Sequence, residues 1–254
     1  MSVNPYSRYQ KASSKFKHRL LGRSAGEVGT GKTSFWLSGP APIVIMSFDR
    51  GLEGVVEPFV AAGKEIYVAE YDWSPSPDED FQAQAIELRD RYKEDFVNAI
   101  NNARTVILDK ETDLWELYRY AEFGQPNTSQ QRDYAPLNQR YRQLINMTKS
   151  LDVNFGVIQG MKDEWGVYTK ANGKEGNGPT GNRIPKGFDE MDGLVHLQLM
   201  HVREGNQISI EVGKVRGPGS RDIQGSTFTA MDSTTAFQEF AMAVFPDSEP
   251  EEWE

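Results

Sequence analysis

A glycine-rich run between two regular segments constrains this chain more than any other part of its sequence. Residues 26–33 match the pattern G-x-x-x-x-G-K-[ST], in which glycine lets backbone N–H groups turn toward an anion. Residues 19–25 are expected to form a strand before the run, and residues 32–37 a helix after it. Because such a helix directs its positive end at the same anion, the run predicts a phosphate-binding loop.

Each residue type in this loop has a task in nucleotide binding. The ammonium group of Lys32 supplies charge to the β- and γ-phosphates, and the hydroxyl of Thr33 is a ligand for Mg²⁺. The alternative, a glycine turn without a ligand, does not account for the strand before the run and the helix after it. The expected nucleotide-binding residues are Gly26, Glu27, Val28, Gly29, Thr30, Gly31, Lys32, Thr33 and Ser34.

Apolar runs alternate with amphipathic segments along the rest of the chain. Strands are expected at residues 43–48, 65–71, 105–108, 153–159, 194–200 and 207–214. Helices are expected at residues 81–99, 114–123, 137–151 and 234–245. This order predicts an α/β fold, with a mostly parallel sheet flanked by helices and antiparallel strands added in the C-terminal part.

Composition excludes several classes of protein. The 254 residues, 38% of them apolar, can bury one real core. Zero cysteines exclude disulfides and thiolate metal sites, and three scattered histidines argue against zinc. There is no apolar run long enough to span a membrane and no signal-peptide pattern, so we expect a cytoplasmic protein with no membrane partner. A net charge of −9 argues against a uniformly basic nucleic-acid-binding surface.

Charge is concentrated at the two ends of the chain. Residues 1–26 hold six bases and no acid, and residues 247–254 hold five acids and no base. We therefore expect a basic N-terminal arm (1–18), an ATPase domain (19–246) and an acidic C-terminal tail (247–254). The arm could hold phosphates or a neighbouring subunit, and the tail could compete for a basic groove. Two solvated, mobile termini explain the same pattern equally well.

Acidic residues follow two of the predicted strands. Asp109 comes directly after strand 105–108 and is the expected second protein anchor for Mg²⁺, with helix capping as its alternative role. Hydrolysis also needs a carboxylate that orients or deprotonates water. We rank Asp49 first, then Glu111, then Glu53, although each could be a solvated loop acid.

The order of these motifs resembles that of the RecA-like ATPases, and more narrowly the small phage-encoded ones associated with single-strand annealing and recombination. The resemblance covers most of residues 20–230. It implies ATP and Mg²⁺ as cofactors, and the host cytoplasm as the location if the chain is phage-encoded. The segments that carry it are residues 26–34, a strand ending at Asp49, and residues 105–117, 157–165 and 211–217.

The resemblance also implies roles for individual catalytic residues besides Lys32. Asp49 stands where these enzymes carry a catalytic glutamate, so Glu53 could substitute for the shorter side chain. Gln159 matches a glutamine that links the γ-phosphate to a DNA-binding loop; by itself it could be a polar strand end. Lys214 and Arg216 match a basic pair that reaches the neighbour's ATP site, which implies a homo-oligomer, ring or filament. Without the resemblance, this pair would be an ordinary exposed strand edge.

Two polar segments match the DNA-binding loops of these ATPases. Residues 124–136 match the first and offer Arg132 and Tyr134. Residues 161–187, which we expect to be a long polar loop with six glycines, match the second. A glycine-rich segment of mixed charge is also typical of a loop without a ligand. The expected contacts of the second loop, backbone charge and base stacking, are Lys162, Trp165, Tyr168, Lys170, Lys174, Arg183 and Lys186.

The sequence thus predicts a DNA-stimulated ATPase that acts on single-stranded DNA in recombination or strand annealing. Its expected partners are single-stranded DNA, further copies of itself and a single-strand-binding protein. Three alternatives stay open: a DNA-binding module that uses ATP only as an assembly switch, a small-molecule kinase, and a phage-assembly motor acting on duplex DNA or protein. The extra strand with a terminal acid between the two magnesium motifs favours ATP hydrolysis over the kinase.

Overall fold

The computed structural model describes residues 17–48, 51–74, 81–125, 130–169 and 175–254. The strands of its main sheet are β1 (Leu21–Gly26), β2 (Ile43–Ser47), β3 (Ile66–Glu70), β4 (Thr105–Asp109), β5 (Asn154–Gln159), β8 (Leu197–Glu204), β9 (Gln207–Lys214) and β10 (Thr227–Phe228). They lie in the order β10-β9-β8-β1-β5-β4-β2-β3. The neighbouring strands from β8 to β3 are parallel, whereas β9 pairs antiparallel with both β8 and β10 at one edge of the sheet. The predicted α/β fold class is therefore confirmed.

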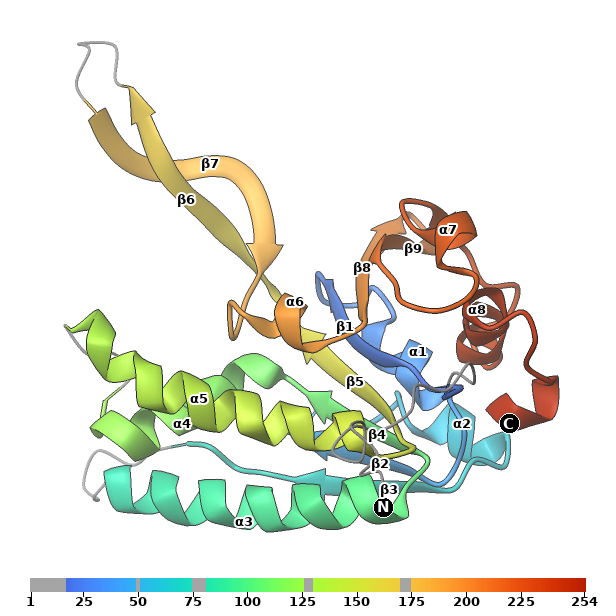
Figure 1. The fold of residues 1–254 in the computed structure, drawn as a ribbon, viewed down its shortest axis with the longest axis horizontal. Coiled ribbons are helices and arrows are strands. Elements are labelled where there is room, and N and C mark those ends of the chain that lie inside the picture. Colours follow the sequence, from blue (N-terminus) through green and yellow to red (C-terminus); the bar gives the residue numbers. More distant parts are fainter. Residues whose placement is uncertain (1–16, 49–50, 75–80, 126–129, 170–174) are drawn as a thin grey trace, which may run out of the picture.

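Helices cover both faces of this sheet (Figure 1). The helices are α1 (Lys32–Leu37), α2 (Glu57–Ala61), α3 (Phe81–Asn102), α4 (Glu111–Phe123), α5 (Tyr134–Asn146), α6 (Met191–Leu194), α7 (Ser220–Ile223) and α8 (Ala236–Val244). Short 3₁₀ turns follow or precede them at η1 (Gln131–Asp133), η2 (Met147–Ser150) and η3 (Pro250–Trp253). No helix within the described ranges has the length and apolar character that crossing a bilayer requires.

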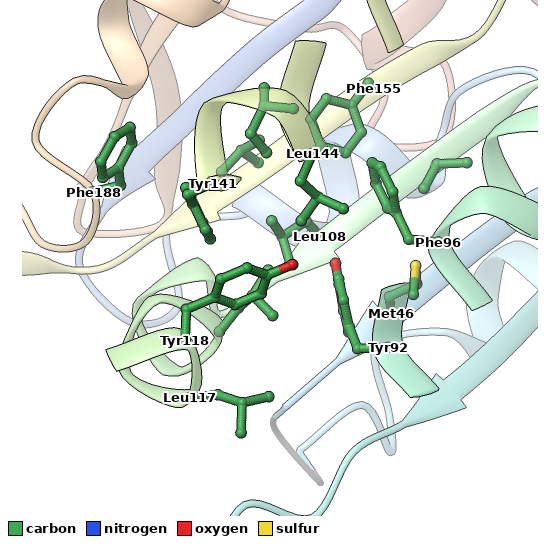
Figure 2. Close-up of a cluster of buried hydrophobic side chains, with 14 of the residues drawn as sticks. Met46, Tyr92, Phe96, Leu108, Leu117, Tyr118, Tyr141, Leu144, Phe155 and Phe188 are labelled. Atoms are coloured by element: carbon green, nitrogen blue, oxygen red, sulfur yellow. The ribbon is translucent and has the colours of Figure 1, made fainter. Parts of the chain in front are cut away.

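Each face of the sheet has its own apolar cluster. Helices α3, α4 and α5 pack over one cluster, in which Tyr92, Phe96, Tyr141 and Phe155 are fully buried (Figure 2). Helices α1, α2 and α8 cover the other face, where Trp36 and other aromatic side chains form the second cluster. Because both faces are covered, strands β1, β4 and β5 are buried along their whole length, as is usual in parallel sheets.

The indole ring of Trp36 fixes α1 against the middle of the sheet. Its Nε1 donates a hydrogen bond to Ser24 Oγ at 2.9 Å. A Cβ atom added at Gly156 would lie 2.3 Å from the ring, so glycine in β5 is what lets the helix approach so closely. This packing sets the position of the loop between β1 and α1.

Residues 161–187 do not form the long polar loop expected from the sequence. They form an antiparallel hairpin of β6 (Met161–Thr169) and β7 (Glu175–Pro185), which projects away from the main sheet (Figure 1). The expectation was wrong because the two strands satisfy each other's backbone hydrogen bonds. Such pairing does not require the alternation of apolar residues by which a strand is recognised in a sequence. Its large apolar side chains Trp165 and Val167 are 70% and 68% exposed.

The C-terminal segment 247–254 packs onto the domain through Trp253, and its acidic side chains are exposed. Trp253 is 1% exposed, and its Nε1 donates to Ser248 Oγ at 2.8 Å. Glu252 lies 2.7 Å from Nδ1 of His18, which connects this end to the start of the described chain. Burial of one large aromatic side chain offsets the repulsion among the neighbouring carboxylates.

We predict that Trp253→Ala lowers the free energy of unfolding by about 3–5 kcal/mol, because it removes a fully buried aromatic side chain. Urea denaturation followed by circular dichroism measures the change. The exposed neighbour Glu251 provides the control, since Glu251→Ala is expected to change stability by less than about 0.5 kcal/mol. Equal stability of the two variants would show that the tail does not contribute to the core.

Candidate functional site

The glycine-rich loop lies at the carboxyl end of β1, between the parallel neighbours β5 and β8, and α1 follows it. Gly29 and Gly31 have φ angles of 76° and 78°, in the left-handed region that glycine adopts without strain. At Gly26 an added Cβ would lie 2.4 Å from the backbone oxygen of His201. The loop conformation therefore requires glycine at these positions, and the expected strand–loop–helix context is present.

The ammonium group of Lys32 lies inside the turn of this loop. Its Nζ donates hydrogen bonds to the backbone oxygens of Gly26 at 2.9 Å and Glu27 at 2.5 Å. Burial lowers the pKa of Lys32, and the nearby carboxylates of Asp109 and Glu27 oppose this effect. A cation held among backbone groups at a strand end is well placed to exchange these carbonyls for phosphate oxygens.

The predicted magnesium anchor, Asp109, ends β4 two strands away from the loop. It is buried, and Ser47 at the end of β2 donates its hydroxyl to Asp109 Oδ2 at 3.2 Å. Because β4, β5 and β1 are parallel, Asp109 ends its strand at the same end of the sheet as the loop. Lys110 follows in a left-handed conformation, with φ 61°, that is strained for a residue other than glycine.

The oxygen groups of Thr33 and Asp109 are of the kind that Mg²⁺ prefers. Among the described residues no group of three or more histidine, cysteine, aspartate or glutamate side chains could hold a metal ion. Mg²⁺ does not need such a group, because it is usually bound through one or two protein oxygens together with water and phosphate. The donor set therefore fits the expected ion.

The three acids ranked as possible catalytic bases are in different situations. Asp49 lies outside the described residues, two positions after the end of β2. Glu53 is exposed and lines a hollow beside α2 and β3. Glu111 is fully buried, so in this structure its carboxylate does not face water.

The carboxylate of Glu111 joins four parts of the fold. It accepts hydrogen bonds from Tyr141 Oη at 2.7 Å, from Gln159 Nε2 at 2.8 Å and from the backbone N–H of Phe188 at 3.2 Å. Burial raises the pKa of Glu111, and these three donors oppose the rise. Gln159, the predicted γ-phosphate sensor, is thus connected through Glu111 to the segment that follows the hairpin.

Lys214 and Arg216 lie away from the phosphate loop of their own chain. Lys214 is the last residue of β9 and pairs in register with Gln198, which pairs with Arg23 in β1, three residues before Gly26. Its Nζ donates to the backbone oxygens of Asp192 at 2.6 Å and Val195 at 2.8 Å. Since β9 ends at Lys214, Arg216 lies beyond the strand.

Further cations surround this pair. Burial lowers the pKa of His196, and the positive charges of Arg216, Arg19, Lys149 and Lys214 lower it further. Burial and the positive charge of Arg216 lower the pKa of Lys214, and the carboxylate of Asp192 opposes this effect. The resulting basic patch could not be predicted from the sequence, because its members come from four separate segments.

The predicted DNA contacts are spread over the hairpin and its base. Trp165 is exposed on β6, whereas Lys170 and Lys174 lie outside the described residues, as does the side chain of Tyr168. Arg132 is exposed beside Asp133. Tyr134, Lys162 and Lys186 come together at one cleft of about 580 Å³.

Arg183 has a contact that sequence reasoning missed. Its Nη2 lies 3.0 Å from Glu27 Oε1 in the phosphate loop, and its Nε lies 3.5 Å from Asp163 in the hairpin. Arg203 also approaches the loop, donating through Nη1 to the oxygen of Gly29 at 3.2 Å. These contacts join elements far apart in sequence, and no local pattern indicates them.

A cavity of about 350 Å³ lies beside the same loop. Gly31, Ser34 and Phe35 form one wall, and Asn206, Ile208 and Ala230 are among the residues opposite. His201 at its floor is almost completely buried; burial, with a smaller contribution from Lys32, lowers its pKa to about 3. This neutral, partly apolar space is large enough for a nucleobase.

The sequence matches no protein-family model, and no curated protein matches it significantly. A crystal structure of the RadB recombinase has a similar backbone, with a TM-score of 0.42 and 14% identity. The similarity covers 82% of this chain and 84% of that one.

We predict that Gly187→Ala disrupts the contacts of Glu111. Gly187 has φ 141°, and an added Cβ would lie 1.8 Å from Glu111 Oε2 and 2.7 Å from Gln159 Nε2. Overpacking and backbone strain should together lower the free energy of unfolding by about 2–4 kcal/mol. Gly160→Ala is the matched control, because nothing lies within 4 Å of its added Cβ. Thermal unfolding of both variants tests this, and equal melting temperatures would contradict it.

Proposed function

We propose that this protein is an ATP-dependent, RecA-like protein that acts on single-stranded DNA in recombination or strand annealing. The single observation that carries the nucleotide half of this proposal is the ring of loop backbone around the Lys32 ammonium group, with the Asp109 carboxylate on the same side. A loop that only turned the chain would need neither a half-buried cation nor a strand-end carboxylate beside it.

In the proposed complex, residues 26–34 bind the phosphates of ATP through backbone N–H groups and Lys32. Thr33 and Asp109, the latter held by Ser47, would hold Mg²⁺, whose positive charge would offset that of the phosphates. The cavity between α1 and the β8–β9 edge holds the nucleoside part, because it is continuous with the loop at Gly31 and Ser34.

For hydrolysis, Asp49 stays the first candidate to orient or deprotonate the attacking water. It follows β2, whose terminal Ser47 already contacts Asp109 across the sheet. The alternatives are less well placed: Glu53 lines a different hollow, and Glu111 would have to exchange its three hydrogen bonds for a contact with water.

We also propose that neighbouring subunits share each nucleotide site. Lys214 and Arg216 lie on a basic patch that does not face the loop of their own chain, so their charge is available to phosphates of another copy. Cations supplied in this way stabilise charge that develops during phosphoryl transfer.

The DNA half of the proposal rests on the hairpin. It projects from the carboxyl end of β5, after Gln159 (Figure 1). It carries the exposed side chain of Trp165. Stacking on this ring together with backbone charge gives binding with little base specificity and strong salt dependence. A single-strand-binding protein is a further expected partner.

A second candidate function is a DNA-binding module that uses ATP only as an assembly switch. The aspartate at position 49, where the RecA-like ATPases carry a longer glutamate, supports it, and Glu111 is held by three donors and is not free to take over the role. Single-turnover measurement of ATP cleavage with and without single-stranded DNA separates the two functions. A small-molecule kinase would need an acceptor substrate, and a duplex motor would be stimulated more by duplex than by single strands.

We predict that Lys32→Ala and the double variant Lys214→Ala/Arg216→Ala each reduce steady-state ATP turnover by at least about 100-fold. Mixing the two inactive proteins in equal amounts should restore activity. About a quarter of interfaces in a random cyclic or filamentous assembly then combine an intact loop with intact cations. Phosphate release in the presence of polythymidylate measures the effect.

Arg221, which is exposed on α7, provides the control for this mixing experiment. Arg221→Ala should keep wild-type turnover without mixing. If the double variant keeps full turnover by itself, or if two folded variants show no recovery on mixing, the site is not shared between subunits.

A further inference from the structure

The cleft at the base of the hairpin has the chemistry of a binding site. It lies between α4, α5 and the segment after β7, and Trp115, Tyr134, Asn138, Lys162, Lys186 and Phe188 are among its lining residues. Three of these residues belong to the predicted DNA contacts, whereas Trp115, Asn138 and Phe188 do not. The cleft is distinct from the cavity beside the phosphate loop, which is lined by different residues.

Aromatic side chains form part of the cleft wall. The ring of Trp115 packs against Phe188 at 4.8 Å and against Tyr141 at 5.0 Å between centroids, so its orientation is fixed. Tyr134 begins α5 and is held by an edge contact with Phe123 at 5.2 Å. Rings fixed by packing are good partners for stacking, because little conformational entropy is lost when a flat ligand binds.

Charged and polar groups complete the cleft. Lys162 lies 3.2 Å from Asp189, and Glu190 is bound by Arg142, so the acids of the cleft are already neutralised. The Oδ1 atom of Asn138 is buried and has no hydrogen-bond partner within the described part of the chain.

The wall of the cleft is connected by hydrogen bonds to Glu111 and to the neighbouring residue Thr112. Thr112 Oγ1 donates to the backbone oxygen of Lys186 at 2.9 Å, and the N–H of Phe188 donates to Glu111. Gln159 donates to the same carboxylate. A ligand that moved residues 186–188 would therefore act on the residue proposed to sense the γ-phosphate.

We propose that this cleft receives one nucleotide unit of a single DNA strand, with its base against Trp115 and Tyr134 and its phosphate near Lys162 and Lys186. This inference rests on the proposed function, since it names where the strand binds. The aromatic wall selects a flat ring, and the lysines select an anion. A base paired inside a duplex would present neither its face nor its edge, so the cleft distinguishes single strands from duplex.

The test is fluorescence titration of the full-length protein with oligothymidylate, with Trp115 as the reporter. Binding should quench tryptophan emission in the wild type, and the quenched fraction should fall in Trp115→Phe, which keeps an aromatic ring in the core. Tyr134→Leu should weaken binding by about 5-fold or more, as expected for loss of one stacked base. Lys186→Gln should reduce the slope of log Kd against log salt by about 1.

Lys93→Gln on the exposed side of α3 is the matched control and should leave affinity and salt slope unchanged. Circular dichroism of every variant checks that it is folded. The proposal is overturned if Trp115→Phe shows the same quenched fraction as the wild type and Tyr134→Leu binds within twofold of it.

Trp165→Phe separates failure of this inference from failure of the proposed function. Binding that responds to Trp165 but not to Trp115, Tyr134 or Lys186 would leave DNA binding on the hairpin and remove the cleft. A wild-type protein that binds nucleotide but no oligothymidylate would contradict both the cleft and the DNA half of the proposed function.

Discussion

The turn that connects β1 to α1 is possible only with glycine, and both proposed sites are arranged around it. A side chain at Gly26 would collide with the backbone of β8, and Gly29 and Gly31 have left-handed conformations. The turn is held in place from outside: β5 and β8 flank β1, and Trp36 fixes α1 to the sheet through Ser24. Rigid surroundings are what allow a loop of glycines to keep its backbone N–H groups in one arrangement.

A second constraint connects this loop to the hairpin. The fully buried carboxylate of Glu111 needs hydrogen-bond donors, and the fold supplies them from α5, from the end of β5 and from the segment after β7. The contact between Glu27 and Arg183 provides a shorter connection at the surface. If nucleotide and DNA bind as proposed, these contacts are where their affinities become coupled, and the coupling must then act equally in both directions.

The sequence predicted the parts of the structure that depend on local patterns. Apolar strands ending at Asp109 and Gln159, and the strand–loop–helix order around Lys32, could be recognised because periodicity and glycine placement report them directly. The hairpin could not, because polar strands that pair only with each other carry no apolar alternation. The packing of Trp253 and the position of Asn138 could not be predicted either, since both depend on which segments meet in three dimensions. Asp49, the first-ranked base, lies outside the described residues and stays a prediction.

The proposed function requires that residues 26–33 bind the phosphates of a nucleotide. Calorimetric titration with ATP, ADP and AMP in the presence of Mg²⁺ tests this most directly. We expect one site per chain that binds ATP and ADP at least about 100-fold more tightly than AMP, because AMP lacks the phosphates that Lys32 and the loop N–H groups would contact. Lys32→Ala should remove this preference. Equal affinity for AMP and ATP, or an unchanged preference in the Lys32 variant, would contradict the account.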